Sequence, residues 1–390
     1  MAQIMKLSDC ATIISGQSPK SEYYNTDGNG IPFFQGKADF GELYPQIRVY
    51  CTTPTKVAEK DDILLSVRAP VGPTNLAPTK VCIGRGLSAI RPNEKIKLKY
   101  LLWFFRYFET QLSSKGTGTT FKAINQQIIK NLDIPVPSLA EQQQIVTRIE
   151  ELFSELDKGV ETLQTIKQQL AVYRQAVLKE AFEGNFKRCT LKEISTAISG
   201  YAFKSKKYTT SGNYIVVKIG NVKQWNFDFS RDLTKTNEVD DTILTKYLMK
   251  QGDCLITLTG SRGKRDYGFV AMIEDEDNFL LNQRVAALRF NTEVALPKFY
   301  MYYLTSFDYR NQFFSYETGN VGQGNVGIKA LSEPIVVCPP LKTQYKIVEE
   351  IESRLSVCDS IEQTVDTALA QAESMRQSIL KKAFEGGFSE

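Results

Sequence analysis

The chain has 390 residues, 42% of them hydrophobic and 24% charged, which is typical of a globular protein with room for two or three domains. It contains no histidine, so the commonest general base and the commonest transition-metal ligand are missing and an enzyme is less expected. No apolar run reaches the ~18 residues that span a bilayer, and the N-terminus lacks the apolar stretch of a signal peptide. We therefore expect a cytoplasmic protein.

The net charge of +4 is unevenly distributed along the chain. Residues 1–133 carry a net +6 and residues 188–334 a net +3, whereas residues 134–187 and 335–390 carry −2 and −3. Two larger basic segments thus alternate with two shorter acidic ones, and basic segments suit a polyanion such as DNA. Imbalances of this size also arise without function, so charge alone leaves both interpretations open.

The first segment, residues 1–133, is predicted to be a mixed α/β domain. Runs rich in β-branched residues and bounded by turn residues predict strands at Ile31–Gln35, Ile63–Val67 and Val81–Arg91. A helix is predicted over Lys99–Gln111. Its aromatic residues are expected in the core rather than as platforms for stacked bases, namely Trp103, Phe104 and Phe105.

The second segment, residues 134–187, is predicted to contain one long helix over residues 140–182. The sequence Ser138-Leu139-Ala140-Glu141 fits a capping box before it, and Gly184 provides a stop after it. Apolar residues recur every seven positions, which is typical of a left-handed coiled coil. The first seam consists of Ile149, Leu156, Leu163, Leu170 and Val177, and the second of Ile145, Leu152, Ile166 and Tyr173.

The third segment, residues 188–334, is predicted to be a second mixed α/β domain. Its predicted strands are Tyr214–Ile219, Cys254–Thr259, Gly268–Ile273 and Arg284–Phe290. A helix is predicted over Pro297–Phe314, with Tyr300, Tyr302 and Tyr303 in the core.

The last segment, residues 335–390, repeats the heptad pattern. Its seams are Ile351, Cys358, Val365, Ala372 and Ile379, and Ile347, Ile361, Ala368 and Met375. If this helix packs beside the first, chain direction requires an antiparallel pair, and about 40 residues at 1.5 Å rise span ~60 Å. Two helices of an ordinary bundle and a homodimeric coil are the alternatives.

The two halves of the chain are related by an internal duplication. Residues 174–186 match residues 376–388 at nine of thirteen positions, with a spacing of 202 residues. The same spacing aligns Gln142 with Gln344. The globular segments correspond more weakly, and their loops differ most. This pattern fits two modules with one fold and different ligands, although drift of unused loops would look the same.

The polar loops of the globular segments carry the residue types that contact DNA. Arg and Lys reach phosphates and guanine edges, and Asn and Gln read adenine, although solvated turns show the same composition. In the first segment the candidates are Gln17, Lys20, Arg68, Lys115, Thr117, Thr119 and Lys122. In the second they are Lys204, Lys206, Lys207, Lys218, Asn221, Gln224, Arg262, Lys264, Arg265, Gln323 and Asn325.

The chain shows no motif for chemistry of its own. The glycine-rich runs are not followed by Gly-Lys-Ser/Thr, so no Walker A loop is present. The Asp/Asn-Pro-Pro-aromatic tetrapeptide of amino-methyltransferases is missing, and no Asp/Glu–Lys nuclease cluster is recognisable. The scattered cysteines form no C-x-x-C pair, which argues against zinc. Methyl transfer or cleavage would therefore lie on other chains.

The whole chain resembles the specificity subunit of Type I restriction-modification systems. The resemblance rests on I-P-x-P-x-x-x-E-Q-x-x-I-V at residues 134–146 and on the L-K-x-A-F-E-G endings at residues 178–184 and 380–386. It implies a non-catalytic subunit with two target recognition domains, each reading half of a bipartite DNA site. The helices would set the spacer and dock methyltransferase subunits that carry S-adenosylmethionine. Restriction subunits that use ATP and magnesium would join this complex.

Two other functions remain open at the level of sequence. One is a stand-alone bivalent DNA-binding protein without enzyme partners, and the other is a coiled-coil scaffold that binds only proteins. Copurification with a methyltransferase distinguishes the first, and salt-dependent binding to random duplex DNA distinguishes the second.

Overall fold

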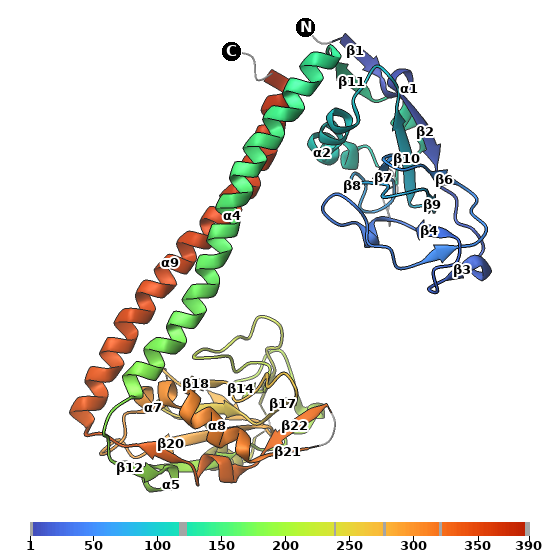
Figure 1. The fold of residues 1–390 in the computed structure, drawn as a ribbon. Coiled ribbons are helices and arrows are strands. Elements are labelled where there is room, and N and C mark those ends of the chain that lie inside the picture. Colours follow the sequence, from blue (N-terminus) through green and yellow to red (C-terminus); the bar gives the residue numbers. More distant parts are fainter. Residues whose placement is uncertain (1–2, 117–122, 238, 276–277, 320–321, 387–390) are drawn as a thin grey trace. The chain divides into compact units, whose positions relative to one another are not determined.

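The computed structural model of the protein describes residues 3–116, 123–237, 239–275, 278–319 and 322–386. They form two compact units, one of residues 1–164 and 366–390 and the other of residues 165–365 (Figure 1). Each unit combines one globular segment with parts of both long helices. Among the described helices, none is long and apolar enough to cross a membrane.

The described part of the first unit contains three sheets. Their strands are β1 (Gln3–Lys6), β2 (Ala11–Ser15), β3 (Tyr24–Asn25), β4 (Ile31–Phe34), β5 (Tyr50–Cys51), β6 (Val57–Ala58), β7 (Ile63–Ser66), β8 (Thr74–Leu76), β9 (Val81–Ile83), β10 (Leu87–Pro92) and β11 (Asp133–Val136). The strand orders are β1-β11, β2-β10-β7-β8 and β3-β5-β4-β9-β6. Its helices are α1 (Leu7–Cys10), α2 (Leu98–Ser114) and α3 (Gln126–Lys130), with short 3-10 turns at Ser21–Tyr23 and Lys37–Asp39.

The described part of the second unit contains four sheets. Their strands are β12 (Arg188–Thr190), β13 (Ser195–Ser199), β14 (Tyr214–Val217), β15 (Lys235–Thr236), β16 (Cys254–Thr257), β17 (Thr259–Ser261), β18 (Val270–Met272), β19 (Phe279–Leu281), β20 (Val285–Phe290), β21 (Glu317–Thr318), β22 (Gln323–Val326) and β23 (Ile335–Val337). The orders are β12-β23, β13-β20-β16-β18, β15-β14-β19 and β17-β22-β21. Its helices are α5 (Leu191–Ile194), α6 (Asp241–Tyr247), α7 (Pro297–Tyr303) and α8 (Phe307–Ser315), with 3-10 turns at Ser205–Lys207 and Ile328–Leu331.

The two units repeat one topology. The antiparallel pair β1-β11 corresponds to β12-β23, and the central sheet β2-β10-β7-β8 corresponds to β13-β20-β16-β18. In both units a parallel pair follows, β4 with β9 and β14 with β19. The predicted fold class, two similar mixed α/β domains joined to long helices, is therefore confirmed.

A buried ion pair recurs at the same place in both central sheets. The Asp62 carboxylate accepts two hydrogen bonds from the Arg91 guanidinium, through Nε and Nη2, each at 2.8 Å. Asp253 receives those of Arg289 at 2.8 and 2.6 Å. Both carboxylates are buried, and each also accepts a backbone N–H, so the charge is fully paired. The duplication thus extends to side-chain contacts.

The repeated Ile-Ser-Gly sequence has a packing reason. A Cβ on Gly16 would lie 2.2 Å from the carbonyl oxygen of Gly84, and one on Gly200 would lie 1.9 Å from that of Asn282. Only glycine allows the backbone to approach so closely at these two positions. In the first unit the contact joins the end of β2 to the turn before β10, and in the second it joins the end of β13 to the turn before β20.

Two predicted elements are each divided in the structure. The strand predicted over Val81–Arg91 is two strands, β9 and β10, because the turn at Gly84–Gly86 sends them into different sheets. The helix predicted over Pro297–Phe314 ends at Tyr303 and restarts at Phe307. Ser306 takes an extended backbone there and its hydroxyl caps the new helix.

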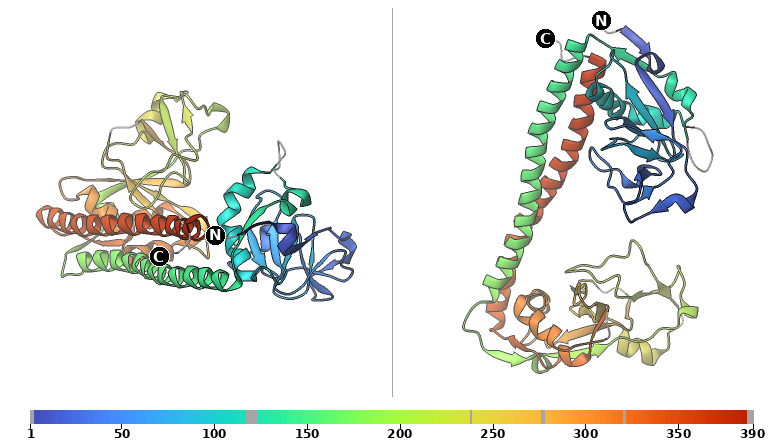
Figure 2. Two further views of the ribbon diagram at one scale, coloured as in Figure 1. Left: turned by 90° about the horizontal axis from the view of Figure 1, so that it is seen from above. Right: turned by 45° about the vertical axis from the view of Figure 1, so that its right-hand side comes forward.

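The two long helices are α4 (Leu139–Phe182) and α9 (Leu341–Lys381), with a π-helical turn at Lys382–Gly386. In the first unit Phe153 packs with Leu380, and Arg376 pairs with Asp157. In the second unit Arg174 contacts Asp359 at 2.6 Å and Glu180 contacts Arg354 at 2.6 Å. In each unit, residues with higher numbers on α4 contact residues with lower numbers on α9. The two helices therefore pair antiparallel within the chain, as predicted (Figure 2).

The first predicted heptad seam is buried or half-buried throughout, with Leu156, Leu163 and Ile379 half-buried, and the second seam was predicted only in part. Ile149, Leu170 and Val177 are buried, as are Ile351, Cys358, Val365 and Ala372. Tyr173, Ile361 and Met375 of the second seam are 40–54% exposed, which corrects their predicted role. Their neighbours Arg174, Glu362 and Arg376 are only partly exposed and form ion pairs instead. A helix with 3.6 residues per turn drifts from a seven-residue repeat, so the facing position moves to the next residue.

Candidate nucleic-acid interface

In the first unit, predicted residues gather around the turn between β9 and β10. The backbone N–H of Gln17 donates to the carbonyl of Ile83 at 3.0 Å, and the N–H of Val67 donates to that of Gly86 at 2.9 Å. The loop after β2 and the loop after β7 therefore meet the same turn. The side chains of Gln17 and Arg68 are exposed beside it.

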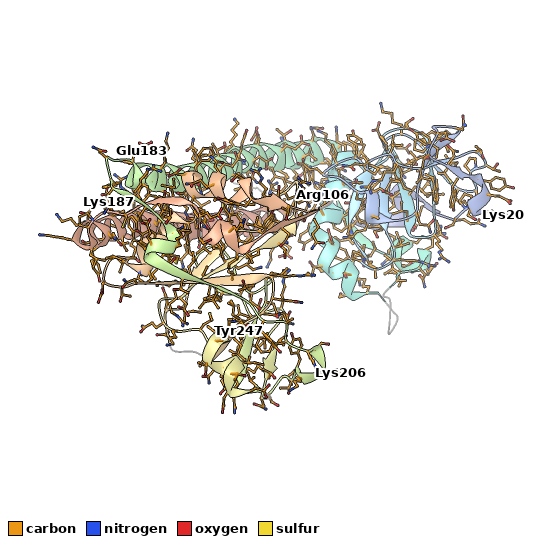
Figure 3. All side chains as sticks on the ribbon, turned by 90° about the horizontal axis from the view of Figure 1, so that it is seen from below. Lys20, Arg106, Glu183, Lys187, Lys206 and Tyr247 are labelled. Atoms are coloured by element: carbon orange, nitrogen blue, oxygen red, sulfur yellow. The ribbon has the colours of Figure 1, made fainter. Side chains whose placement is uncertain are left out.

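Lys20 extends from the same loop into solvent. Its side chain is 78% exposed and lies 3.6 Å from the carboxylate of Glu22, which is a loose surface pair (Figure 3). Such a lysine can exchange a weak intramolecular partner for a phosphate at small cost.

Arg85 also belongs to this group, although it was not among the DNA-contact residues predicted from the sequence. It is exposed at the tip of the turn, and its backbone N–H donates to Ser18 Oγ at 3.2 Å. Ser18 Oγ in turn donates to Gln35 Oε1 at 2.9 Å. The signal was available, because a basic residue flanked by Gly84 and Gly86 marks a cationic turn.

The other predicted residues of the first unit lie at the end of α2. Lys115 is exposed at its C-terminal cap. Thr117, Thr119 and Lys122 lie outside the described residues.

In the second unit, the small sheet β17-β22-β21 carries several predicted residues. Gln323 pairs with Ser261, and Asn325 pairs with Thr259, across antiparallel strands. The side chains of Gln323 and Asn325 are exposed. This sheet places the loop at 261–265 and the strand at 323–326 next to each other, which their separation in sequence does not predict.

The loop between β17 and β18 presents three basic side chains, of which two make contacts. Arg262 donates to the carbonyl of Gly319 at 3.1 Å and lies 3.6 Å from Glu317. Arg265 lies over the ring of Phe314 at 4.8 Å and adopts a left-handed backbone with φ 49°. Lys264, between them, is exposed. The loop is held in shape while its cations remain at the surface.

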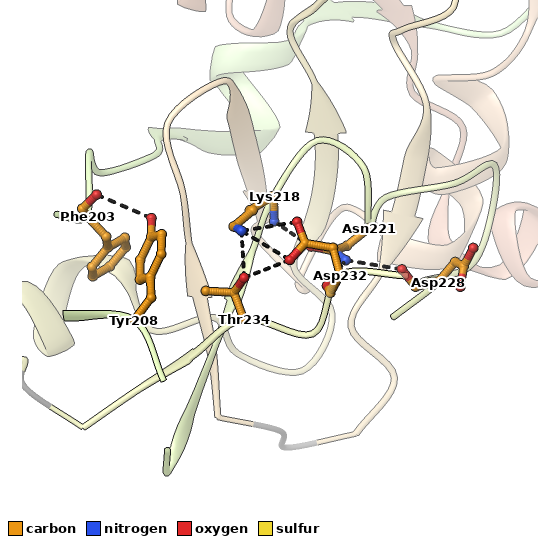
Figure 4. Close-up of polar contacts among 7 residues, drawn as sticks. All are labelled: Phe203, Tyr208, Lys218, Asn221, Asp228, Asp232 and Thr234. Atoms are coloured by element: carbon orange, nitrogen blue, oxygen red, sulfur yellow. Dashed lines mark hydrogen bonds and ion pairs between the residues drawn. The ribbon is translucent and has the colours of Figure 1, made fainter. Parts of the chain in front are cut away.

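Lys218 and Asn221 build a loop rather than projecting from it (Figure 4). Lys218 Nζ contacts both carboxylate oxygens of Asp232 at 3.0 and 3.1 Å and lies 5.1 Å from the ring of Tyr208. Hydrogen bonds from Thr234 and Lys218 lower the pKa of Asp232. The carboxylate is therefore ionised at neutral pH and neutralises the lysine.

Asn221 is 1% exposed, and its hydrogen-bonding groups are occupied. Its Nδ2 donates to the carbonyls of Asp228 and Asp232 at 3.1 and 2.7 Å, and its Oδ1 accepts the N–H of Lys218 at 2.9 Å. A base contact would require breaking these bonds, which corrects the prediction for Asn221. Asparagine in this role is a loop organiser.

The remaining predicted residues of the second unit lie in two places. Gln224 is half-buried in the loop after Lys223. Lys204, Lys206 and Lys207 are exposed in and before the 3-10 turn at Ser205–Lys207, and Figure 3 shows Lys206 at an outer tip of its unit.

Three of these loops of the second unit enclose one cleft of about 420 Å³. Its lining includes residues 219, 220, 222 and 223, β17 and its loop, and residues 322 and 323, with Arg284 contributed by the turn before β20. Lys223 and Arg284 are exposed and were not predicted. Asp266 also lines the cleft, and the backbone N–H of Ser261 donates to it at 2.6 Å and lowers its pKa.

Comparison with known families gives a match in both halves of the chain. Residues 2–170 and 183–371 each match the Type I restriction modification DNA specificity domain. The chain belongs to this family. The double match agrees with the duplicated topology and with the prediction of a recognition subunit that is not itself an enzyme. Among the described residues, no group of three or more Cys, Asp or Glu side chains could hold a metal ion.

Curated relatives of this specificity-domain family are similar over parts of their length. The chain is 39% identical over 176 residues to a putative type I restriction enzyme MjaX specificity subunit of Methanocaldococcus jannaschii, covering 45% of the chain and 40% of the relative. It is 26% identical over 328 residues to the type I restriction enzyme EcoKI specificity subunit of Escherichia coli strain K12, covering 79% of the chain and 69% of the relative.

Solved structures of this family share the fold over nearly the full chain. One comes from a study of complex assembly and conformational transition of the type I restriction-modification system, with a TM-score of 0.76, 18% identity and coverage of 99% and 98%. Another is the HsdS subunit of Thermoanaerobacter tengcongensis, with a TM-score of 0.58, 19% identity and coverage of 99% and 97%. At these identities the likeness concerns the fold.

Proposed function

We propose that the chain is the DNA sequence-recognition subunit of a Type I restriction-modification complex, and that each unit reads one half of a bipartite site. The observation that carries this proposal is the repetition of one specificity-domain fold with different loops. Equal backbones with unequal polar loops fit two readers of different sequences, because base edges are read by side chains and not by the fold.

The predicted loop residues supply the means of binding in each unit. Exposed cations such as Lys20, Arg68 and Lys206 suit phosphates, and Gln323 and Asn325 offer amides to base edges. Lys218 and Asn221 support the loop that lines the cleft. We therefore assign DNA contact to the predicted set without Lys218 and Asn221, and add Arg85, Lys223 and Arg284.

The paired helices are proposed to set the spacer and to dock methyltransferase subunits. In the second unit Val172 is 71% exposed and Val357 is 59% exposed. Exposed apolar side chains on helices that already pair with each other suit a protein partner better than DNA. The acidic balance of the helical segments favours the same assignment.

The chemistry is proposed to lie on the partner chains. Methyltransferase subunits would supply S-adenosylmethionine, and restriction subunits would supply ATP-dependent cleavage with magnesium. A cytoplasmic location, where the host DNA is accessible, follows from this role.

Coexpression of the full chain with the methyltransferase of its own system tests the proposal. A stable complex that methylates adenines within a split motif, mapped by single-molecule sequencing of host DNA, is the expected result. A chain that purifies alone and binds DNA without such a partner would instead be a stand-alone bivalent binder. Absence of salt-dependent binding to duplex DNA would leave only a protein scaffold.

A further inference from the structure

The two units place different residues at one equivalent pair of backbone positions. In the first unit the N–H of Val67 donates to the carbonyl of Gly86 at 2.9 Å, and in the second the N–H of Leu258 donates to that of Arg284 at 2.9 Å. The residue after Val67 is Arg68, and the residue after Leu258 is Thr259. One unit thus has Arg and Gly where the other has Thr and Arg.

A further hydrogen bond supports this equivalence. The carbonyl of Val67 accepts the N–H of Ile124 at 3.0 Å, and that of Leu258 accepts the N–H of Val326 at 2.9 Å. The backbone hydrogen bonds around this position are therefore equivalent in the two units. What differs is which of the two neighbouring chain segments presents the arginine.

Arg284 is held in a backbone conformation that arginine disfavours. Its φ is 71°, in the left-handed region where a Cβ meets the neighbouring carbonyl and which glycine adopts at lower cost. Its side chain is exposed, and among the residues that the structure describes its guanidinium has no hydrogen-bond or ion-pair partner. Strain at a residue without an internal partner points to a role outside the fold.

The cleft beside Arg284 contains a second unsatisfied group. Thr259 lines the cleft and is only 8% exposed, and its Oγ1 has no hydrogen-bond partner among the described residues. A buried hydroxyl without a partner is unusual and is satisfied when a ligand supplies one. Gln323 and Lys223 line the same cleft and add an amide and a cation. The Asp266 carboxylate in the lining accepts the N–H and the hydroxyl of Ser261. The other polar side chains of the cleft therefore present mainly donors to an acceptor-rich ligand.

We propose that this cleft is the base-reading centre of the second unit, with Arg284 as the specificity-determining residue for one guanine. The proposal rests on the proposed DNA-recognition function and deepens it. In the major groove guanine presents two acceptors, O6 and N7, which match the two parallel donors of a guanidinium. The exposed Gln323 amide lines the same cleft and is available to the adjoining base edge.

Selection of the full chain against a randomised duplex library, at one fixed salt concentration, tests this assignment. Arg284→Ala is expected to reduce the preference for guanine at one position of one half-site by about tenfold or more, and to leave the other half-site unchanged. Arg284→Gly is expected to lose the same preference while melting at a higher temperature than Arg284→Ala, because glycine accepts the positive φ. Lys192→Ala, which removes a charge of α5 outside the cleft, serves as the control.

The outcomes separate this assignment from the function on which it rests. If Arg284→Ala weakens binding uniformly over all sequences and lowers the salt slope by about one, Arg284 contacts a phosphate and the base-reading assignment is overturned. An altered preference in both half-sites would overturn it as well. If the unaltered chain selects no split motif, the DNA-recognition function itself fails.

Discussion

Gln142 and Gln344 occupy the same position in the two halves of the molecule and make the same three hydrogen bonds. Gln142 is fully buried in the first turns of α4. Its Oε1 accepts the N–H of Lys97 at 2.7 Å, and its Nε2 donates to the carbonyls of Lys95 and Pro137 at 3.0 and 2.9 Å. The side chain thus ties the start of the long helix to the loop before α2.

Gln344 repeats this arrangement at the start of α9. Its Oε1 accepts the N–H of Leu296 at 2.7 Å, and its Nε2 donates to the carbonyls of Val294 and Pro339 at 2.8 and 2.7 Å. A glutamine is needed because it alone among the uncharged side chains offers this reach with both a donor and an acceptor. These two sets of glutamine hydrogen bonds fix the direction in which each long helix leaves its globular segment.

Replacing Gln142 by leucine is expected to destabilise the protein by about 2–3 kcal/mol, because buried backbone groups lose their partners. Urea denaturation measures the free energy of unfolding. Gln344→Leu should give a similar loss. Gln144→Leu, at an exposed position of the same helix, is the matched control. Equal stability of Gln142→Leu and Gln144→Leu would contradict the stabilising role of the Gln142 hydrogen bonds.

The loop around Lys218 should weaken in acid. The pKa of Asp232 lies below its ordinary value of 3.8. A carboxylate whose pKa is lower in the folded state than in the unfolded state stabilises the folded protein at pH values above the unfolded-state pKa. This contribution is lost as the pH falls through the folded-state pKa. The stability of the unaltered protein should therefore decline below about pH 3.8 in part through this group. Asp232→Asn should show a shallower decline in acid denaturation, and parallel curves for the two proteins would count against the contact.

Two exposed valines on the long helices of the second unit should be required for partner binding. Val172→Asp and Val357→Asp place a charge at positions that are 71% and 59% exposed, so the fold should be unaffected. Copurification with the methyltransferase subunit is expected to fall at least tenfold, because burying an unpaired charge costs several kcal/mol. Gln169→Asp, also exposed on α4, controls for charge alone. Unchanged yield with both valine variants would exclude these two positions as partner contacts.

Much of this organisation could be predicted from the sequence, because long helices and duplications leave periodic signals. The capping box is present, with the N–H of Ser138 donating to Glu141 at 2.9 Å and the N–H of Glu141 donating to Ser138 at 3.3 Å. The predicted core aromatics Tyr300 and Tyr303 are fully buried. Local patterns of capping and apolar spacing decide these features.

The candidate site could be predicted only in composition. Asn221 has the residue type of a base reader, but hydrogen bonds to the carbonyls of Asp228 and Asp232 use its amide internally. Arg284 was missed because it stands directly before a buried strand, and its positive φ has no sequence signal of the usual kind, which is glycine. The cleft depends on loops that tertiary contacts bring together, and one sequence does not fix those contacts.

Lengthening the helix pair should lengthen the spacer of the target. Asp157 and Arg376 lie at one level, so a heptad inserted after Gly159 can be matched by a heptad after Glu373. Seven residues add ~10 Å, which corresponds to about three base pairs at 3.4 Å each. The methylated motif should keep both half-sites and gain that spacing. A same-length replacement is the control, and an unchanged spacer would remove the role of the helices as a ruler.

The most direct test of two independent readers is an exchange of one of them. Residues 188–334 are replaced by the corresponding segment of another family member, and methylated adenines are mapped by single-molecule sequencing in a host that carries the complex. The account predicts a motif in which one half-site changes and the other half-site and the spacer are retained. A change in both half-sites at once would contradict it.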